Sequence, residues 1–192
     1  ALRTLVMQGY FRCITRVLKA LMDSRVTPAN GRVAANFLKG KVNSESFLEG
    51  SKAQCGFGPT DLLNAHDGNR VSQLSLGDPI KVFERLNGFA YIQSEKDQYC
   101  GYISESYVAP RTKLSHWVYV AGSNSYIKPD FKQKDMNEFF LGDKVTVKKV
   151  TGVWAELTNG GFIPVCHLRK IEYQLVDYVA TSRLLLNSPY LW

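Results

Sequence analysis

Two stretches of the chain share one pattern of apolar and polar positions. LSLGDPIKVFERLNGFAYIQ (74–93) and FFLGDKVTVKKVTGVWAELT (139–158) both begin near Leu-Gly-Asp, alternate as a strand does, turn at a glycine and end in an aromatic-Ala strand. Leu76 and Ala90 correspond to Leu141 and Ala155 at one constant spacing. After a shorter hairpin, the similarity resumes between GYISESYV (101–108) and GFIPVCHL (161–168). The chain therefore contains two copies of one unit.

Each copy is expected to form short antiparallel strands. Ile80 and Val82 alternate with charged residues in the first copy, and Val145 and Val147 do so in the second. The Leu-Gly-Asp segments suit the turn before a strand, because glycine and aspartate favour turn conformations. About 60 residues with five or six such strands is the size of a small SH3-like barrel.

The segments on either side of the repeat are predicted to be helical. Thr27-Pro28 is a plausible helix start, and the apolar stripe that follows it ends at Gly40. The stripe consists of Val33, Ala34, Phe37 and Leu38. A second amphipathic pattern stops at Asn187-Ser188-Pro189 and consists of Leu175, Val176, Val179, Ala180 and Leu184.

We therefore expect a mainly β fold, with two tandem SH3-like small barrels, an N-terminal helix and a C-terminal helix. The expected segments are a leader or non-native segment (1–22), an N-terminal helix with its connection (23–56), a first SH3-like domain (57–110), a second SH3-like domain (111–171) and a C-terminal segment (172–192).

The charge first suggests a nucleic-acid partner, because the net charge is +7 and the isoelectric point is about 9.2. Four of these positive charges lie in the acid-free residues 1–21, as in a transit peptide, and Met22 is a plausible start. A nucleic-acid partner is therefore disfavoured, and it is kept as the weaker alternative. A membrane partner is not expected, since no apolar stretch approaches the roughly 20 residues that span a bilayer.

Local chemistry reveals no catalytic or metal site. The four cysteines have no CxxC or metal-like spacing, so no cofactor is expected and free thiols are the simplest account. Cys166 and His167 are read as strand neighbours that point to opposite faces, a core cysteine beside a surface histidine. His66 and His116 have no partner at ligand spacing.

Other polar and aromatic residues have ordinary structural explanations. The acids Asp61, Asp67 and Asp97 are expected to cap their own turns. The aromatic residues interleaved with lysines are expected to pack in the barrels and beside a peptide groove rather than to stack on nucleic acid. These aromatic residues are Tyr91, Tyr99, Tyr102 and Trp154.

A resemblance to a known family becomes specific at the C-terminus. LLLNSPYLW (184–192) resembles the opening of the papain-like catalytic domain of NlpC-type cysteine endopeptidases, which cleave the γ-D-glutamyl to diamino acid bond of murein peptides. DSRVTPANGRVAANFLKGKV (23–42) is similar to the N-terminal segment of bacterial dipeptidyl-peptidase members, which precedes two bacterial SH3-like domains. On this resemblance, 172–192 is the beginning of a truncated papain-like domain.

The resemblance also implies what is missing and what remains. The chain contains no Asp-Cys-Ser-Gly nucleophile motif and no histidine after it, so we expect no catalytic residue in this chain and no hydrolysis by it alone. Tyr99 resembles the family residue that lines the substrate pocket, and Tyr190 matches the tyrosine beside the nucleophile.

The leading functional hypothesis is therefore the substrate-gating region of a murein-peptide cysteine endopeptidase. The expected partners are murein peptides of the type L-Ala-γ-D-Glu-diamino acid, with either a separate catalytic chain or a homo-oligomer formed through the C-terminal helix. A cytoplasmic role in peptide recycling is expected. A stand-alone cell-wall or peptide-binding module is the alternative from a different class.

Overall fold

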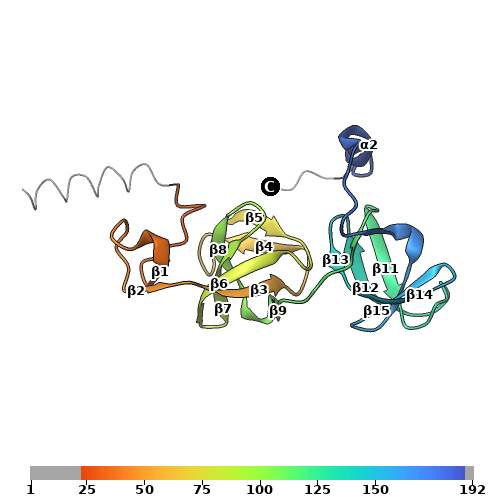
Figure 1. Ribbon diagram of the computed structural model, residues 1–192, viewed down its shortest axis with the longest axis horizontal. Coiled ribbons are helices and arrows are strands. Elements are labelled where there is room, and N and C mark those ends of the chain that lie inside the picture. Colours follow the sequence, from red (N-terminus) through yellow and green to blue (C-terminus); the bar gives the residue numbers. More distant parts are fainter. Residues whose placement is uncertain (1–22, 189–192) are drawn as a thin grey trace, which may run out of the picture.

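A computed structural model describes residues 23–188, in which two small β-barrels follow one another along the chain (Figure 1). The expected mainly β fold with SH3-like barrels is confirmed. None of the helices within the described residues is long and apolar enough to cross a membrane.

The first barrel is one antiparallel sheet with the strand order β5-β4-β8-β7-β6-β3-β9. Its alternating apolar residues point inward, and Leu62, Ile80, Ile92 and Ile103 are almost completely buried at its centre. Its elements are β3 (Ser51–Cys55), β4 (Thr60–Leu63), β5 (Arg70–Leu74), β6 (Pro79–Leu86), β7 (Phe89–Ser94), β8 (Cys100–Ser104), the 3₁₀ turn η2 (Glu105–Tyr107) and β9 (Val108–Pro110).

The second barrel consists of two sheets, ordered β12-β11-β16-β15-β14 and β13-β10-β17. Val118, Phe139, Leu157 and Ile163 form the centre of its core. Its elements are β10 (His116–Val118), β11 (Gly122–Tyr126), β12 (Asp135–Phe140), β13 (Lys144–Val145), β14 (Val147–Thr151), β15 (Trp154–Leu157), β16 (Phe162–Pro164), the 3₁₀ turn η3 (Val165–His167) and β17 (Leu168–Lys170).

The internal repeat is visible in the irregularities of the strands. The β6–β7 ladder shifts register between Val82 and Glu84, and the β14–β15 ladder shifts at the equivalent place, between Val147 and Lys149. A β-bulge places two residues opposite one, so its position is a specific feature of a strand pair. The two barrels therefore share this bulge, and the strand order β5-β4-β8-β7-β6 of the first corresponds to β12-β11-β16-β15-β14 of the second.

The expected N-terminal helix is wrong for the described residues of this segment. The segment forms β1 (Val33–Ala35), the 3₁₀ turn η1 (Asn36–Leu38) and β2 (Ser46–Leu48), and β1 pairs with β2 in parallel. Three consecutive buried residues in β1 suit a strand covered on both faces rather than one stripe of a helix. These residues pack against Phe83 and Tyr91 of the first barrel.

The expected C-terminal helix is present but short, as α2 (Tyr178–Arg183). Asp177 caps it, because its Oδ1 accepts a hydrogen bond from the Ala180 N–H at 2.8 Å. Val176 and Tyr178 are 87% and 75% exposed, so this helix does not pack on the described part of the barrels.

Candidate functional site

An ion pair joins the N-terminal segment to the first barrel. Arg32 Nε and Nη2 donate to the two carboxylate oxygens of Glu84 at 2.8 and 2.6 Å. Asn30 Nδ2 donates to the same carboxylate at 2.9 Å. The hydrogen bonds from Arg32, followed by that from Asn30, lower the pKa of Glu84 although partial burial opposes this. Glu84 is therefore an anion at neutral pH.

Two local features of the backbone bring these side chains together. Glu84 follows the bulge in β6 and lies opposite Tyr91 on β7, on the face that the N-terminal segment covers. On the other side, Gly31 has φ +93°, a left-handed conformation that glycine adopts readily. It forms a turn with Asn30, whose Oδ1 accepts hydrogen bonds from the N–H groups of Arg32 and Val33.

Three aromatic rings lie beside the ion pair. His66, in the loop between β4 and β5, stacks on Phe89 with ring centroids 4.6 Å apart and planes 4° apart. Tyr102 meets His66 edge-on at 4.8 Å, and its hydroxyl accepts a hydrogen bond from Asn30 Nδ2 at 3.1 Å. We call Arg32, Glu84, His66 and Tyr102 the ring–ion cluster.

A close approach of two strands fixes the position of Tyr102. Gly101 precedes it on β8, and a Cβ atom at Gly101 would clash with the backbone oxygen of Leu63 on β4. Only glycine allows this spacing without displacement of a strand. The tyrosine is therefore held against the loop that carries His66.

Three members of the ring–ion cluster, all except Glu84, border a hollow of about 500 Å³. The hollow is lined by Arg32, Asn64, Ala65, His66, Asp67 and Tyr102. These side chains offer charges of both signs and ring faces, which suits binding of a small polar ligand. Among the described residues, no group of three His, Cys, Asp or Glu side chains could hold a metal ion.

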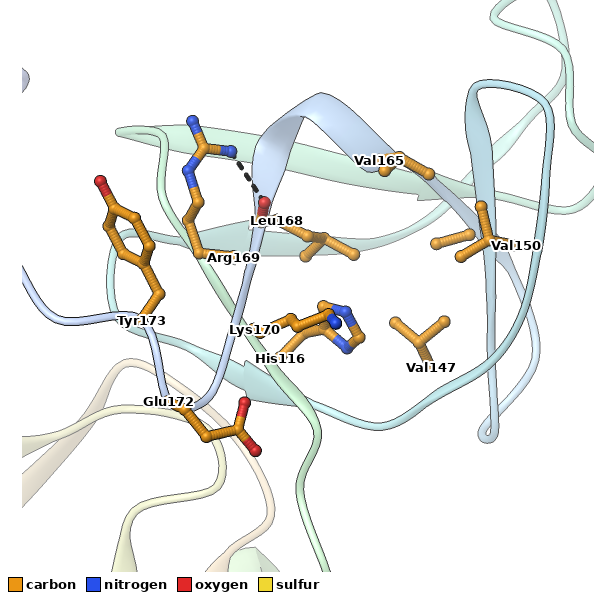
Figure 2. Close-up of a pocket in the computed structure, with 10 residues that line it drawn as sticks. His116, Val147, Val150, Val165, Leu168, Arg169, Lys170, Glu172 and Tyr173 are labelled. Carbon is orange, nitrogen blue, oxygen red and sulfur yellow. Dashed lines mark hydrogen bonds between the residues drawn. The ribbon is translucent and has the colours of Figure 1, made fainter.

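A second hollow of about 510 Å³ lies in the second barrel (Figure 2). Its walls are mostly apolar, and they include Val147, Val165 and Leu168. His116 also lines it, and its Nδ1 lies 2.9 Å from the hydroxyl of Ser115. Half of its lining residues are apolar, whereas Ala65 is the one apolar residue that lines the hollow of the first barrel, so it gives less basis for recognition of a specific polar ligand.

The two tyrosines predicted from the sequence to bind substrate are not part of the cluster. Tyr99 packs against the core of the first barrel, with the guanidinium of Arg25 5.8 Å from its ring centroid. It does not line the hollow, whereas Tyr102 does. Its role in substrate binding stays a prediction, and Tyr190 lies outside the described residues.

The expectation that Cys166 is a core strand residue and His167 a surface one is wrong. Both residues lie in η3 rather than in a strand, and Cys166 is exposed whereas His167 is partly buried. His167 Nδ1 lies 2.8 Å from the hydroxyl of Ser123, and burial lowers the pKa of His167. This histidine therefore helps to hold η3 against β11.

Two other sequence expectations also have definite outcomes. Asp61 lies within β4 and pairs with Arg70 at 2.7 Å, so the expectation that it caps a turn is wrong. Asp97 does cap its turn, because its Oδ1 accepts a hydrogen bond from the Tyr99 N–H at 3.1 Å. Tyr91 is 5% exposed, which confirms core packing for that residue.

The sequence reasoning missed the ion pair altogether. Arg32 and Glu84 are far apart in the chain and belong to different segments, and neither belongs to a recognisable motif. The one available signal was the repeat, since Glu84 stands where the second copy has Lys149. A reversal of charge between equivalent positions marks a place where the two copies differ in their partners.

Comparison with known proteins gives a family match within the first barrel. Residues 64–108 match the family described as bacterial dipeptidyl-peptidase Sh3 domain. This range includes His66, Glu84 and Tyr102 of the ring–ion cluster. No curated protein matches the chain.

One solved structure shows a similar fold over most of the chain. A crystal structure of an NlpC/P60 family protein from Bacillus cereus ATCC 10987 has a TM-score of 0.59 at 15% identity, over 74% of this chain and 66% of that one. The chain thus spans slightly less than two thirds of that protein. NlpC2 and NlpC1 from Trichomonas vaginalis match with TM-scores of 0.27 and 0.26 and identities of 17% and 15%. The match covers 70% and 69% of this chain, and 52% and 50% of theirs.

Proposed function

We propose that this chain positions short murein peptides for an NlpC-type cysteine endopeptidase that hydrolyses the γ-D-glutamyl to diamino acid bond. One observation carries the proposal: His66 and Tyr102, inside the stretch that matches the bacterial dipeptidyl-peptidase Sh3 domain, line a hollow together with Arg32, the partner of Glu84. The similarity in fold to an NlpC/P60 family protein supports the same setting.

The charges of the cluster suit a zwitterionic peptide. The peptide L-Ala-γ-D-Glu-diaminopimelate carries an ammonium group at its start and several carboxylates along its length. Glu84 does not line the hollow itself, but its carboxylate, kept anionic by the lowered pKa, is bonded to Arg32 at the edge of the hollow, where it can hold the ammonium group. Arg32 uses Nε and Nη2 for Glu84, so its Nη1 can donate to a carboxylate of the peptide.

The rings of the cluster suit the small apolar part of the same peptide. His66 and Tyr102 both line the hollow and meet edge to face. A methyl group such as that of L-Ala can pack against ring faces at such a corner, while water is displaced from both. Recognition of a free N-terminal alanine thus combines one charge contact with one apolar contact.

Hydrolysis itself then belongs to a catalytic domain that supplies a thiol and an imidazole. In the described residues, Cys55 and Cys100 are buried, and burial raises the pKa of both thiols, that of Cys100 to about 12. A thiol with a raised pKa is a poor nucleophile at neutral pH. Cys166 is exposed, but within the described residues no hydrogen bond joins it to His167, whose Nδ1 contacts Ser123. The proposed role is binding and selection, and it suits recycling of short free peptides in the cytoplasm.

Titration calorimetry of the full chain with L-Ala-γ-D-Glu-diaminopimelate tests this function. We expect micromolar binding, and affinity about tenfold weaker when the peptide is N-acetylated, because the contact between Glu84 and the ammonium group is lost. Glu84→Gln should weaken binding to a similar extent. Glu105→Gln is the matched control, since Glu105 pairs with Arg85 on the exposed surface.

Two results would count against the proposal. One is the absence of heat at millimolar peptide, and the other is equal affinity for the free and the N-acetylated peptide. Circular dichroism of the Glu84→Gln protein should match that of the unsubstituted chain, so that a loss of binding reports on the site.

A further inference from the structure

The second barrel contains a counterpart of the aromatic part of the ring–ion cluster. His66 lies on Phe89, and at the equivalent positions of the repeat Phe131 contacts Trp154 with the same centroid distance of 4.6 Å. Both pairs connect a loop between two strands, β4–β5 or β11–β12, to the first residue of the next hairpin strand, β7 or β15. The repeat has thus kept a ring contact on the surface of both barrels.

A third ring completes an open aromatic corner. The ring of Tyr126 lies 5.8 Å from that of Phe131 and 5.7 Å from that of Trp154. Tyr126 pairs with Phe162 on β16, as Leu63 pairs with Tyr102 in the first barrel. Phe131 is 62% exposed. We call Tyr126, Phe131 and Trp154 the second-barrel corner.

The charge next to this corner is opposite to that in the first barrel. Lys149 follows the β14 bulge and lies opposite Glu156, just as Glu84 follows the β6 bulge and lies opposite Tyr91. Lys149 is exposed and has no acidic partner within the described residues. The loop that carries Phe131 adds three further exposed lysines and one aspartate: Lys128, Lys132, Lys134 and Asp130.

The first barrel shows what this face can bind. There, the N-terminal segment covers the face, with Val33 and Leu38 packed around Tyr91 and with Arg32 paired to Glu84. In the second barrel, Phe131 is 62% exposed and Lys149 is exposed, so no described segment covers these residues of the corresponding face. In the first barrel, Glu84 pairs with an arginine. Because Lys149 has the opposite charge at the equivalent position, its complementary partner is an acidic side chain.

We propose that the second-barrel corner and Lys149 bind an acidic, extended polypeptide segment of another protein. Apolar side chains of the segment pack on Phe131 and Trp154, and a carboxylate pairs with Lys149 as Arg32 pairs with Glu84. The loop lysines attract the segment and add charge contacts at its end. This interaction needs neither the hollow of the first barrel nor a murein peptide.

A pair of labelled peptides tests the interaction with the full chain by fluorescence anisotropy. The first peptide copies residues 29–48, and the second is the same peptide with Arg32→Glu, Lys39→Glu and Lys41→Glu. We expect the acidic peptide to bind about tenfold more tightly than the copy, because its charge complements the lysines. Lys149→Glu in the protein should abolish this preference.

Variants of the rings localise the site. Phe131→Ala should weaken binding of the acidic peptide about five- to tenfold, and the variant should stay folded because this side chain is largely exposed. Val153→Ala is the control, because Val153 is an exposed apolar residue at the hairpin turn that precedes Trp154.

Three outcomes would overturn the inference. The first is equal affinity for both peptides. The second is a Lys149→Glu protein that still prefers the acidic peptide. The third is tight binding of oligouridylate by a protein that does not bind the acidic peptide. Binding of the murein tripeptide should be unchanged in Phe131→Ala and Lys149→Glu. Binding of the acidic peptide by the second barrel and binding of the murein tripeptide by the first barrel can therefore be disproved independently.

Discussion

The carboxylate of Asp143 in the second barrel accepts a hydrogen bond from the backbone N–H of Leu76 in the first barrel, at 2.9 Å. Its other oxygen accepts one from the N–H of Phe140 at 2.8 Å, so a single side chain closes its own turn and joins the two barrels. Asp78, its counterpart in the first copy of Leu-Gly-Asp, pairs with Lys144 across the same contact. The two copies of the motif thus meet face to face.

Asp143→Ala should destabilise the chain by about 2–4 kcal/mol, because it leaves two N–H groups without their acceptor at a buried site. Asp143 is 2% exposed, so water cannot easily replace the carboxylate. Urea denaturation followed by tryptophan fluorescence measures the change. Asp135→Ala, at an exposed position on β12, is the control and should change stability little. Equal effects of both substitutions would contradict the role of Asp143.

Lys144→Met should destabilise the chain by an amount that depends on pH. Burial disfavours the charge of Asp78, but Lys144, the Ser75 N–H and Lys96 together outweigh it and lower the pKa of Asp78 below its usual 3.8. A lowered pKa contributes stability that is present above about pH 4 and is lost as pH falls through the folded-state value. We therefore expect a loss of about 2–3 kcal/mol at pH 7, since Lys96 remains as a partner.

This loss should shrink as the pH falls below 3.8, because a protonated Asp78 gains little from Lys144. Urea denaturation of both proteins between pH 7 and pH 3 measures the difference. Lys148→Met is the matched control, because Lys148 is 63% exposed in its pair with Glu156 and should change stability by less than about 1 kcal/mol. A loss that stayed constant over this pH range would show that packing of the Lys144 stem, rather than its charge, matters.

Arg32→Ala should loosen the N-terminal segment while the first barrel stays folded. The substitution leaves Glu84, only 14% exposed, with Asn30 as its remaining side-chain donor. Because the segment is held by this pair and by a small apolar cluster, we expect amide exchange in residues 29–38 to accelerate about tenfold. Hydrogen exchange with mass spectrometry measures it. Lys39→Ala, at an exposed position just beyond η1, is the control. Unchanged exchange would assign the docking to the apolar contacts alone.

The repeat allowed the two barrels to be predicted from the sequence, because a duplicated pattern of strands and turns constrains the fold twice. The Leu-Gly-Asp motif that ends at Asp78 recurs in the motif that ends at Asp143, and both copies do form the same turn. That the two turns contact each other could not be predicted, since nothing in one copy indicates the orientation of the other. The motif predicts the aspartate only as part of its own turn, whereas in the structure Asp143 also joins the two barrels.

The N-terminal segment was predicted wrongly because its apolar spacing fits two structures. Val33, Ala34 and Leu38 could form one stripe of a helix, but β1 instead pairs with β2 and packs on the first barrel. Such pairing depends on residues distant in sequence, which a local pattern does not contain. The candidate site was missed for the same reason, since Arg32 meets Glu84 only after the segment has docked.

Gly101→Ala should disturb the first barrel and its candidate site together. A Cβ atom at this position would clash with the Leu63 backbone oxygen and lie 3.0 Å from Leu62 Cγ, so β4 and β8 would have to separate. We expect a loss of about 1–3 kcal/mol in unfolding free energy, typical of overpacking, and a displaced Tyr102 at the hollow. Urea denaturation and calorimetry with the murein tripeptide measure the two effects. Gly122→Ala is the matched control, because a Cβ atom there meets nothing within 4 Å. If both alanine variants were equally stable, the close approach of β4 and β8 would not constrain residue 101.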